Sequence, residues 1–237
     1  MLEDLKAEVS KANLDLVNKG LVIGTWGNAS GIDRNLGLVV IKPSGVPYTS
    51  ITPNRMVVVS LETGKVLQGD CKPSSDTETH LVLYRAFPGI GGVVHTHSLY
   101  ATAWAQACKP LLVYGTTHAD YWFGKVPCTR LLLKDEIKQD YEANTGHVIV
   151  ETFKKSKMLD PLLHPGVLVA NHGPFVWGKD VADAVHKAEV VEFVARLATE
   201  TLNLQPKCKP IQPDLLKKHY FRKHGPGAYY GQKTSYL

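Results

Sequence analysis

Gly91-Gly-Val-Val-His95-Thr-His97 is the stretch of sequence that decides the fold. Small and β-branched residues leading into a His-x-His pair predict a buried strand that ends in two imidazoles. Side chains alternate between the faces of a strand, so His95 and His97 share a face, roughly 6.5–7 Å apart along the chain. Both rings can then lean toward one cation, although a pair of surface histidines at a strand end fits the same letters.

A second segment of the same shape favours the metal interpretation. Pro165-Gly-Val-Leu-Val-Ala-Asn-His172 is another apolar run that ends in a histidine. Two such strands side by side would supply three histidines and leave room for a substrate, which is the open arrangement of a catalytic metal site. The two segments together predict a catalytic centre at one end of a sheet.

The bulk composition is that of an ordinary globular protein. The chain has 237 residues, of which 44% are apolar and 21% charged, so we expect one domain with a sizeable core. Its net charge of +5 favours an anionic partner such as a phosphorylated metabolite and is too small to indicate nucleic acid. We find no secretory signal, no run long enough to cross a bilayer and no C-x-x-C among four cysteines, and therefore expect a cytoplasmic protein that is not bound to a membrane.

Hydrophobic periodicity divides the chain into alternating helices and strands. Helices are predicted at residues 2–18, 77–87, 98–106, from 135, at 145–155 and at 180–203, and strands at 25–30, 37–41, 57–60, 65–68 and 91–97. We expect Ser75, with Glu78, and Ser98 to cap two of the helices. The tail, about residues 205–237, is basic and aromatic, which fits either a nucleic-acid arm or a segment that closes over a site.

Polar residues suited to anions and to proton transfer lie beside these elements. Lys42-Pro-Ser-Gly45 and Lys72-Pro-Ser-Ser-Asp76 each combine a lysine with hydroxyls, so both are candidate anion cradles, although turn or cap chemistry explains the same residues. Asp76 is a candidate ligand or base, or a carboxylate favoured by the helix dipole. Asp120, in an irregular polar segment, is a candidate proton carrier or a turn residue.

Eight motifs in register resemble the sugar-phosphate epimerases of the class II aldolase/adducin family. They are T-W-G-N-A-S, K-P-S-G, K-P-S-S-D-T, G-G-V-V-H-T-H-S, G-T-T-H-A-D-Y, P-C-T-R, H-G-P-F-x-W-G-K and K-H-Y-x-R-K-H-G-x-x-A-Y-Y-G-Q. The likeness runs from Met1 to Gln232, and residues 233–237 lie beyond it.

The resemblance implies a fold, a cofactor and an assembly. The implied fold is a single α/β domain with a mainly antiparallel central sheet flanked by helices on both faces. The implied cofactor is Zn²⁺, with Mn²⁺ or Co²⁺ as possible substitutes because borderline His/Asp sites accept them. The implied assembly is a C4 homotetramer with active sites at its subunit interfaces. The implied substrate is a sugar phosphate, and no nucleic acid is expected as a partner.

The resemblance also implies three groups of site residues. The metal ligands are Asp76, His95, His97 and His172. The acid/base pair is Asp120 and Tyr230, with Tyr230 supplied by a neighbouring subunit. The substrate contacts are Gly27, Asn28, Lys42, Ser44, Gly45, Ser74, Ser75, Thr116, Glu142, His219 and Arg222.

The implied reaction interconverts L-ribulose 5-phosphate and D-xylulose 5-phosphate by cleaving C3–C4 and rejoining it on the other face of the aldehyde. An aldolase acting on a deoxyketose 1-phosphate is the alternative within the family, although those relatives carry a glutamate in place of Asp76 and lack this tail. A non-catalytic, adducin-like scaffold should have lost metal histidines, and all three are present. L-Arabinose and L-ascorbate degradation both use the epimerase step, so the sequence leaves the pathway open.

Overall fold

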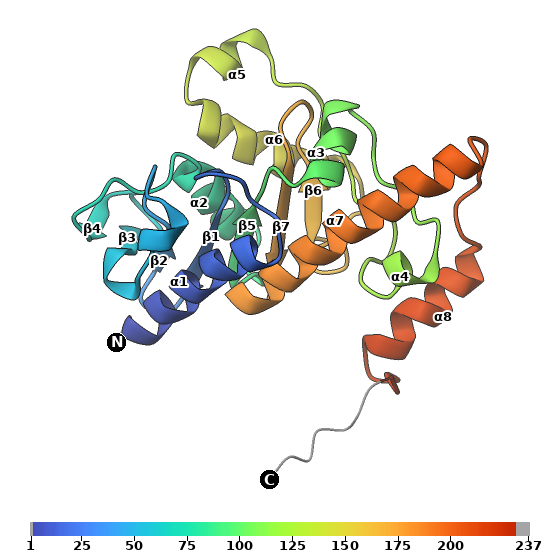
Figure 1. Ribbon diagram of the computed structural model, residues 1–237, viewed down its shortest axis with the longest axis horizontal. Helices are drawn as coiled ribbons and strands as arrows, with labels where there is room; N and C mark the ends of the chain where they lie inside the picture. The colour runs from blue at the N-terminus through green and yellow to red at the C-terminus, as the bar shows by residue number, and fades with distance from the viewer. Residues whose placement is uncertain (1, 231–237) are drawn as a thin grey trace.

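A seven-stranded antiparallel sheet forms the centre of the computed structural model, which describes residues 2–230 (Figure 1). The strands are β1 (Asn28–Asp33), β2 (Leu38–Ile41), β3 (Val57–Ser60), β4 (Val66–Gln68), β5 (Gly92–His95), β6 (Gly166–Leu168) and β7 (Pro174–Gly178). Their order across the sheet is β4-β3-β2-β1-β5-β7-β6, and every neighbouring pair is antiparallel. The predicted α/β fold with an antiparallel central sheet is confirmed.

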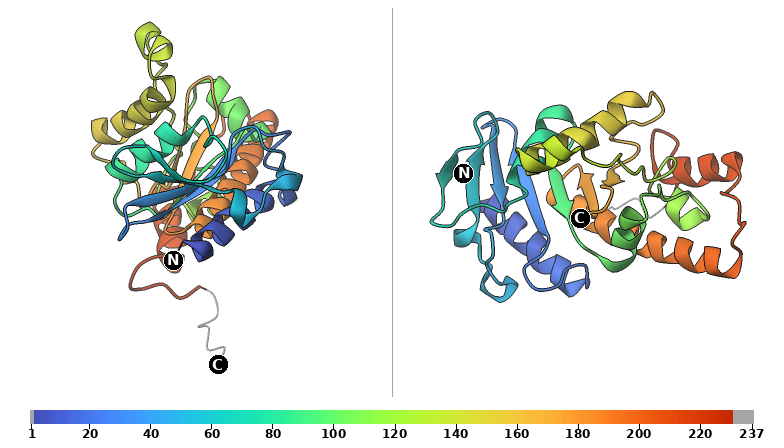
Figure 2. Two further views of the ribbon diagram at one scale, coloured as in Figure 1. Left: turned by 90° about the vertical axis from the view of Figure 1, so that its left-hand side faces the viewer. Right: turned by 90° about the horizontal axis from the view of Figure 1, so that it is seen from above.

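Helices cover both faces of this sheet (Figure 2). They are α1 (Glu3–Asn18), α2 (Thr77–Ala86), α3 (Leu99–Gln106), α4 (Thr116–Ala119), α5 (Lys134–Lys138), α6 (Tyr141–Lys155), α7 (Val181–Leu204) and α8 (Pro213–Lys223), with short 3-10 turns at Tyr48–Ser50 and Pro53–Arg55. None of the helices in the described part of the chain is long and apolar enough to cross a bilayer.

Alternation along the strands separates the core into two layers. Val40 and Val94 point to the face covered by α1, α3 and α7, whereas Ile41 and Val93 point to the face covered by α2 and α6. Because successive side chains of a strand project to opposite faces, a strand that is apolar throughout is buried on both sides. This is why the valine-rich strands β2, β3 and β5 are interior strands of the sheet.

Gly92 at the start of β5 lets α7 approach the sheet closely. A Cβ atom added to Gly92 would lie 2.5 Å from the Cα of Val181 and 2.6 Å from the carbonyl oxygen of Asp180. Asp180 caps α7, and its carboxylate accepts the amide hydrogen of Asp183 at 2.7 Å. Gly91 and Gly92 therefore allow the start of α7 to pack closely against β5, the strand that carries His95.

Two local predictions are wrong. The first strand begins at Asn28 and not at residue 25. Ser75 does not cap α2, whose N-cap position is Asp76. Ser98 does occupy the N-cap position of α3, as predicted, but its side chain makes no capping bond. The structure also adds a helix, α8, within the basic tail.

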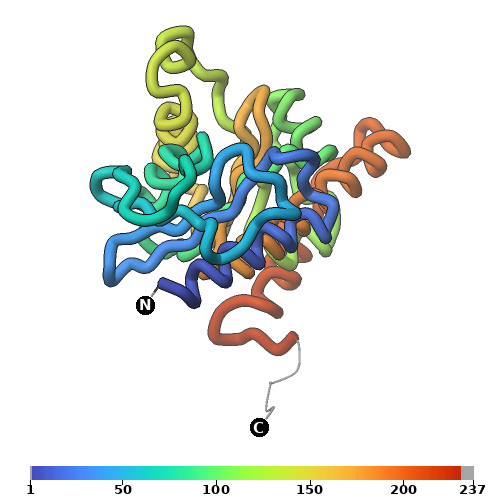
Figure 3. The backbone as a smooth tube through the Cα atoms, turned by 60° about the vertical axis from the view of Figure 1, so that its left-hand side comes forward, coloured from blue at the N-terminus to red at the C-terminus, as the bar shows by residue number. Residues whose placement is uncertain are grey.

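The helix of the tail, α8, lies at the opposite end of the molecule from α5 (Figure 3). It contacts α4 (Figure 1). Residues 231–237, the end of the predicted tail, lie outside the described residues.

Candidate metal centre and substrate cavity

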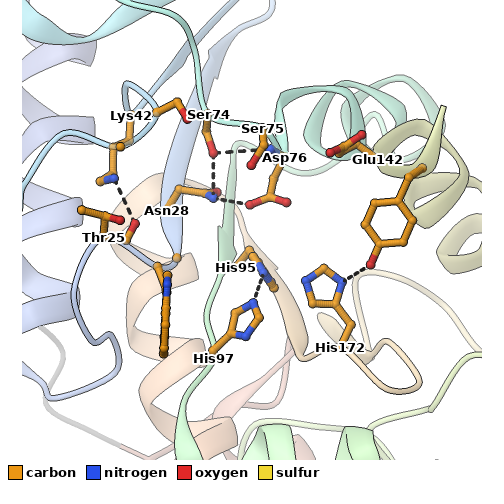
Figure 4. A pocket seen from close by; sticks show the side chains of 15 residues that line it. Thr25, Asn28, Lys42, Ser74, Ser75, Asp76, His95, His97, Glu142 and His172 are labelled. Atoms are coloured by element: carbon orange, nitrogen blue, oxygen red, sulfur yellow. Dashed lines mark hydrogen bonds between the residues drawn. The ribbon is translucent and has the colours of Figure 1, made fainter. Parts of the chain in front are cut away.

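Three histidine rings converge beyond the end of β5. His95 is the last residue of β5 and pairs with Asn28 of β1 on one side and Phe175 of β7 on the other. His97 follows two residues later, and His172 lies in the turn between β6 and β7. One ring nitrogen from each histidine lies within 4.8 Å of the others. Figure 4 shows the three rings gathered at one side of the cavity.

This spacing fits a divalent metal ion. The Nε2 atoms of His95 and His97 are 3.1 Å apart, and the edge of a tetrahedron with Zn–N bonds of 2.0–2.1 Å is roughly 3.3 Å. Imidazole nitrogens are preferred ligands of Zn²⁺, and three of them leave a position open for substrate. The predicted three-histidine cluster is therefore present, with a donor set that suits zinc.

Neighbouring groups orient the rings. The carbonyl oxygen of Pro174 accepts a hydrogen bond from Nδ1 of His95 at 3.0 Å, which places the proton on Nδ1 and leaves Nε2 free to bind metal. Nδ1 of His172 lies 3.4 Å from the hydroxyl of Tyr141. Burial, followed by repulsion from His95, lowers the pKa of both His97 and His172, which favours the neutral rings that coordinate metal.

Asp76 lines the same cavity but lies outside the tight group of three nitrogens. Its Oδ2 accepts a hydrogen bond of 2.6 Å from Nδ2 of Asn28, which also donates to Oγ of Ser74 at 3.0 Å (Figure 4). Burial raises the pKa of Asp76, but attraction to His95 and His80 and the bond from Asn28 outweigh it, so the net pKa is lowered. Asp76 is thus an anion beside the histidines.

The Oδ1 atom of Asn28 is buried and has no hydrogen-bond partner among the described residues. Leaving a buried acceptor unpaired costs about 1–3 kcal/mol. Because Asn28 lines the cavity, this oxygen is available to a donor on a bound ligand.

The two Lys-Pro-Ser segments pair with each other. The amide of Ser44 donates to the carbonyl of Lys72, and the amide of Ser74 donates to the carbonyl of Lys42, both at 2.9 Å. Pro43 and Pro73 form an antiparallel bridge between these bonds. The pairing brings both sets of hydroxyl groups to one wall of the cavity, which separate turns would not do.

Lys42 is a buried cation without an anionic partner. Only 2% of the residue is exposed, and among the described residues it forms no ion pair. Its Nζ lies 3.3 Å from the carbonyl of Thr25, 3.4 Å from that of Pro43 and 4.8 Å from the centre of the Tyr48 ring. Burial lowers the pKa of Lys42 by more than the attraction of Asp76 raises it. Buried lysines are normally paired, so this one predicts a bound anion.

A cavity of about 560 Å³ unites these groups. It brings together most of the predicted ligands and contacts, namely Gly27, Asn28, Lys42, Ser44, Gly45, Ser74, Ser75, Asp76, His95, His97, Glu142 and His172. Thr25, Trp26 and Tyr141 also line it and are not among the residues that the sequence predicts. Thr25 and Trp26 belong to the first of the eight motifs, whereas nothing in the sequence around Tyr141 indicates that its hydroxyl would reach His172.

The other predicted site residues form a separate group on α4 and α8. Asp120 follows α4 and is bound by Arg222, His219 and Lys223 from α8. Tyr230 lies against this group, with its ring 4.6 Å from the guanidinium carbon of Arg222. None of these residues lines the cavity of the same chain, and neither does Thr116 at the start of α4.

Comparison with known sequences gives a consistent match. The model of the class II aldolase and adducin N-terminal domain matches residues 7–199. The L-ribulose-5-phosphate 4-epimerase UlaF of Salmonella paratyphi B is 55% identical over 232 residues, which cover 98% of this chain and 100% of that protein. The protein of the same name from Salmonella typhi is also 55% identical over the same shares.

Solved structures of aldolases have the same fold. An L-fuculose 1-phosphate aldolase superposes with a TM-score of 0.76 and 26% identity, covering 91% of this chain and 94% of the other. The L-fuculose-1-phosphate aldolase of Thermus thermophilus superposes with a TM-score of 0.66 and 22% identity, covering 86% of this chain and 97% of the other. At this identity the match supports only the fold.

Proposed function

The chain belongs to the class II aldolase and adducin family, and from that premise we propose that it is a metal-dependent epimerase that interconverts L-ribulose 5-phosphate and D-xylulose 5-phosphate. The observation that carries the proposal is the single cavity in which three convergent histidines face two paired Lys-Pro-Ser segments. The epimerases that match 98% of the chain at 55% identity support the choice of substrate.

In this proposal His95, His97 and His172 hold Zn²⁺, with Asp76 as a further ligand, and Mn²⁺ or Co²⁺ can replace zinc. The convergence of the three rings supports the first part, and the lowered pKa of Asp76 supports an anion beside them. When bound, the ion would supply Lewis-acid stabilisation of the negative charge that develops on the ketone fragment of the substrate.

The phosphate of the substrate is assigned to the serine wall. Ser44, Gly45, Ser74 and Ser75 line one side of the cavity and offer hydroxyl and amide donors. Lys42 supplies the positive charge for the developing oxyanion, and Asn28 offers its unpartnered Oδ1 to a substrate hydroxyl. Gly27 and Glu142 of the same chain, and Thr116, His219 and Arg222 from the α4–α8 side of a second copy, complete the proposed contacts.

Inversion at C4 needs bond cleavage because the C4 hydrogen is β to the ketone and its removal gives no delocalised anion. A base instead takes the proton of the C4 hydroxyl, C4 becomes an aldehyde, and the electrons of C3–C4 delocalise toward the C2 carbonyl. The aldehyde then rotates and presents its other face to C3. C3 attacks the aldehyde carbon on that face, and an acid protonates the new C4 oxygen. Each face needs its own proton carrier, and Asp120 and Tyr230 are proposed for these two roles.

The proposed proton carriers, Asp120 and Tyr230, can reach a histidine cavity only if that cavity belongs to a second copy of the chain. Within one chain Asp120 and Tyr230 lie on the α4–α8 side and do not line the cavity. Tyr230 is 59% exposed, so its ring is accessible to another molecule. We therefore propose a homotetramer in which the tail closes over the cavity of a neighbouring subunit.

The test is an assay of D-xylulose 5-phosphate formation from L-ribulose 5-phosphate by zinc-loaded protein, with and without a chelator. We expect conversion that the chelator abolishes and added Zn²⁺ restores. Incubation with dihydroxyacetone phosphate and an aldehyde tests the aldolase alternative. An enzyme that joins these two but does not convert the pentose phosphate would overturn the epimerase assignment.

A further inference from the structure

Helix α3 connects the two segments that carry His97 and His172. His97 and Ser98 immediately precede its first residue, Leu99. At its other end the carbonyl of Ala105 accepts a hydrogen bond of 3.0 Å from the amide of Asn171, the residue before His172. A shift of α3 along its axis would therefore move both histidines relative to His95, which is held in the sheet.

The turn at His172 has a second contact with the end of α3. Asn171 adopts a left-handed backbone conformation with φ of 60°, and Cys108 beside it does so with φ of 53°. The thiol of Cys108 lies 3.5 Å from Oδ1 of Asn171. These contacts link the His172 turn directly to the C-terminal end of α3.

The N-terminal end of α3 is capped by a residue from a distant part of the chain. The side chain of Ser98 makes no capping bond. Instead the carboxylate of Glu192, on α7, accepts hydrogen bonds from the amides of Tyr100 and Ala101, each at 2.9 Å. These are amides that a helix leaves unpaired in its first turn, and a carboxylate there also complements the positive end of the helix dipole.

A second polar contact joins α3 to α7 about one turn further along. Nε1 of Trp104 donates to Oγ1 of Thr199 at 2.9 Å and approaches the carbonyl of Ala195 at 3.3 Å. Because α7 packs along β5 and β7, it provides a fixed reference for α3 (Figure 1). Of these two contacts, the one made by Glu192 lies nearer to His97.

We propose that Glu192 is a positioning residue, which sets the start of α3 and thereby holds His97, and through the helix the His172 turn, at the spacing that joint metal binding requires. The inference rests on the proposed metal site and adds a residue that touches neither metal nor substrate. Groups that orient metal ligands typically change metal affinity by roughly 10–100-fold when they are removed.

The experiment measures Co²⁺ binding by the full-length protein, using the visible bands of bound Co²⁺ and competition with a chelator. Glu192→Ala is compared with Trp104→Phe, which removes the other α3–α7 hydrogen bond and serves as the matched control. We expect about tenfold or greater loss of Co²⁺ affinity and altered bands for Glu192→Ala, and less than about twofold change for Trp104→Phe. Glu192→Gln, which keeps one carbonyl acceptor, should fall between wild type and Glu192→Ala.

Several outcomes would overturn the inference. Unchanged Co²⁺ affinity in Glu192→Ala would remove the positioning role, and an equal loss in Trp104→Phe would assign the effect to general packing of α3. If Glu192→Ala does not fold, Glu192→Gln decides: a loss of Co²⁺ affinity clearly larger than that of Trp104→Phe supports the positioning role, and a loss no larger than that of Trp104→Phe removes it. Failure of the wild type to bind Co²⁺ would instead reject the metal site of the proposed function, and this inference with it.

Discussion

The guanidinium of Arg222 binds the carboxylate of Asp120 through two hydrogen bonds, Nε to Oδ1 at 3.1 Å and Nη2 to Oδ2 at 2.7 Å. Nδ1 of His219 is 3.0 Å from Oδ1, and Nζ of Lys223 is 3.2 Å from Oδ2. Partial burial raises the pKa of Asp120, but the bonds from Arg222, His219 and Lys223 outweigh it, so the net pKa is lowered. Asp120 is therefore held as a carboxylate, the form that can accept a proton.

Asp120→Asn should destabilise the protein in a pH-dependent way. Because the folded-state pKa of Asp120 lies below the unfolded value, its contribution is present above about pH 4 and is lost as the pH falls through the folded pKa. We expect the variant to lose about 2 kcal/mol in the free energy of unfolding at pH 7. Urea denaturation at a fixed protein concentration, repeated down to pH 3, should show the two proteins converging. A difference that does not change with pH would contradict the ionic interpretation.

Lys42→Met should separate stability from activity. Removing a buried, unpaired cation relieves a desolvation penalty, so the free energy of unfolding should rise by about 1 kcal/mol. In contrast, kcat/KM should fall by about 10²-fold or more because the positive charge in the cavity is lost. Lys65→Met, at an exposed position, is the control and should change stability by less than about 0.5 kcal/mol. A less stable Lys42→Met protein would show that the lysine is a structural element.

The fold was largely predictable because its signals are local and repeated. The apolar runs that end at His95 and His172 indicate the strands beside the candidate metal ligands, and the spacing of Val185, Ala188 and Ala195 indicates the long helix α7. Periodicity depends on which face a residue presents to the core, and the two core layers preserve that information.

The incorrect or missing predictions concern contacts between distant segments. Ser98 is a residue type that favours helix caps, but Glu192, far along the chain on α7, supplies the carboxylate that binds the first amides of α3. The segments that begin at Lys42 and Lys72 are separate candidates in the sequence, and no local rule says that they would pair. Such partners are chosen by tertiary packing, which a single sequence does not record.

Gly92→Ala should be strongly destabilising because the backbone of α7 occupies the space that a methyl group needs. The added Cβ would lie 2.5 Å from the Cα of Val181, a backbone atom that can move only with the helix. We expect a loss of about 3 kcal/mol in the free energy of unfolding. Gly115→Ala is the control because its Cβ meets nothing within 4 Å and its φ of −150° suits any residue. Equal stability of both variants would mean that α7 does not rest on β5 as described.

Metal analysis should distinguish ligands from proton carriers. His172→Asn removes one of three convergent nitrogens and should lose most of its bound zinc. Tyr230 and Asp120 lie outside the cavity of their own chain, so the Tyr230→Phe and Asp120→Asn variants should each keep about one zinc ion per chain. Their epimerase activity should nevertheless fall by about 10²-fold or more. Loss of zinc from either of these two variants would show that a ligand has been mistaken for a proton carrier.

Co-expression of His97→Asn and Tyr230→Phe chains should restore activity that neither has alone. If the histidines of one chain work with the tail of its neighbour, a mixed tetramer contains sites with intact histidines from the Tyr230→Phe chain and an intact tyrosine from the His97→Asn chain. Random assembly makes about a quarter of the sites complete, so roughly a quarter of wild-type activity should return. If each tail serves the cavity of its own chain, no site is complete and the mixture stays inactive. The separation of Tyr230 from the histidine cavity within one chain is the reason to expect the first result.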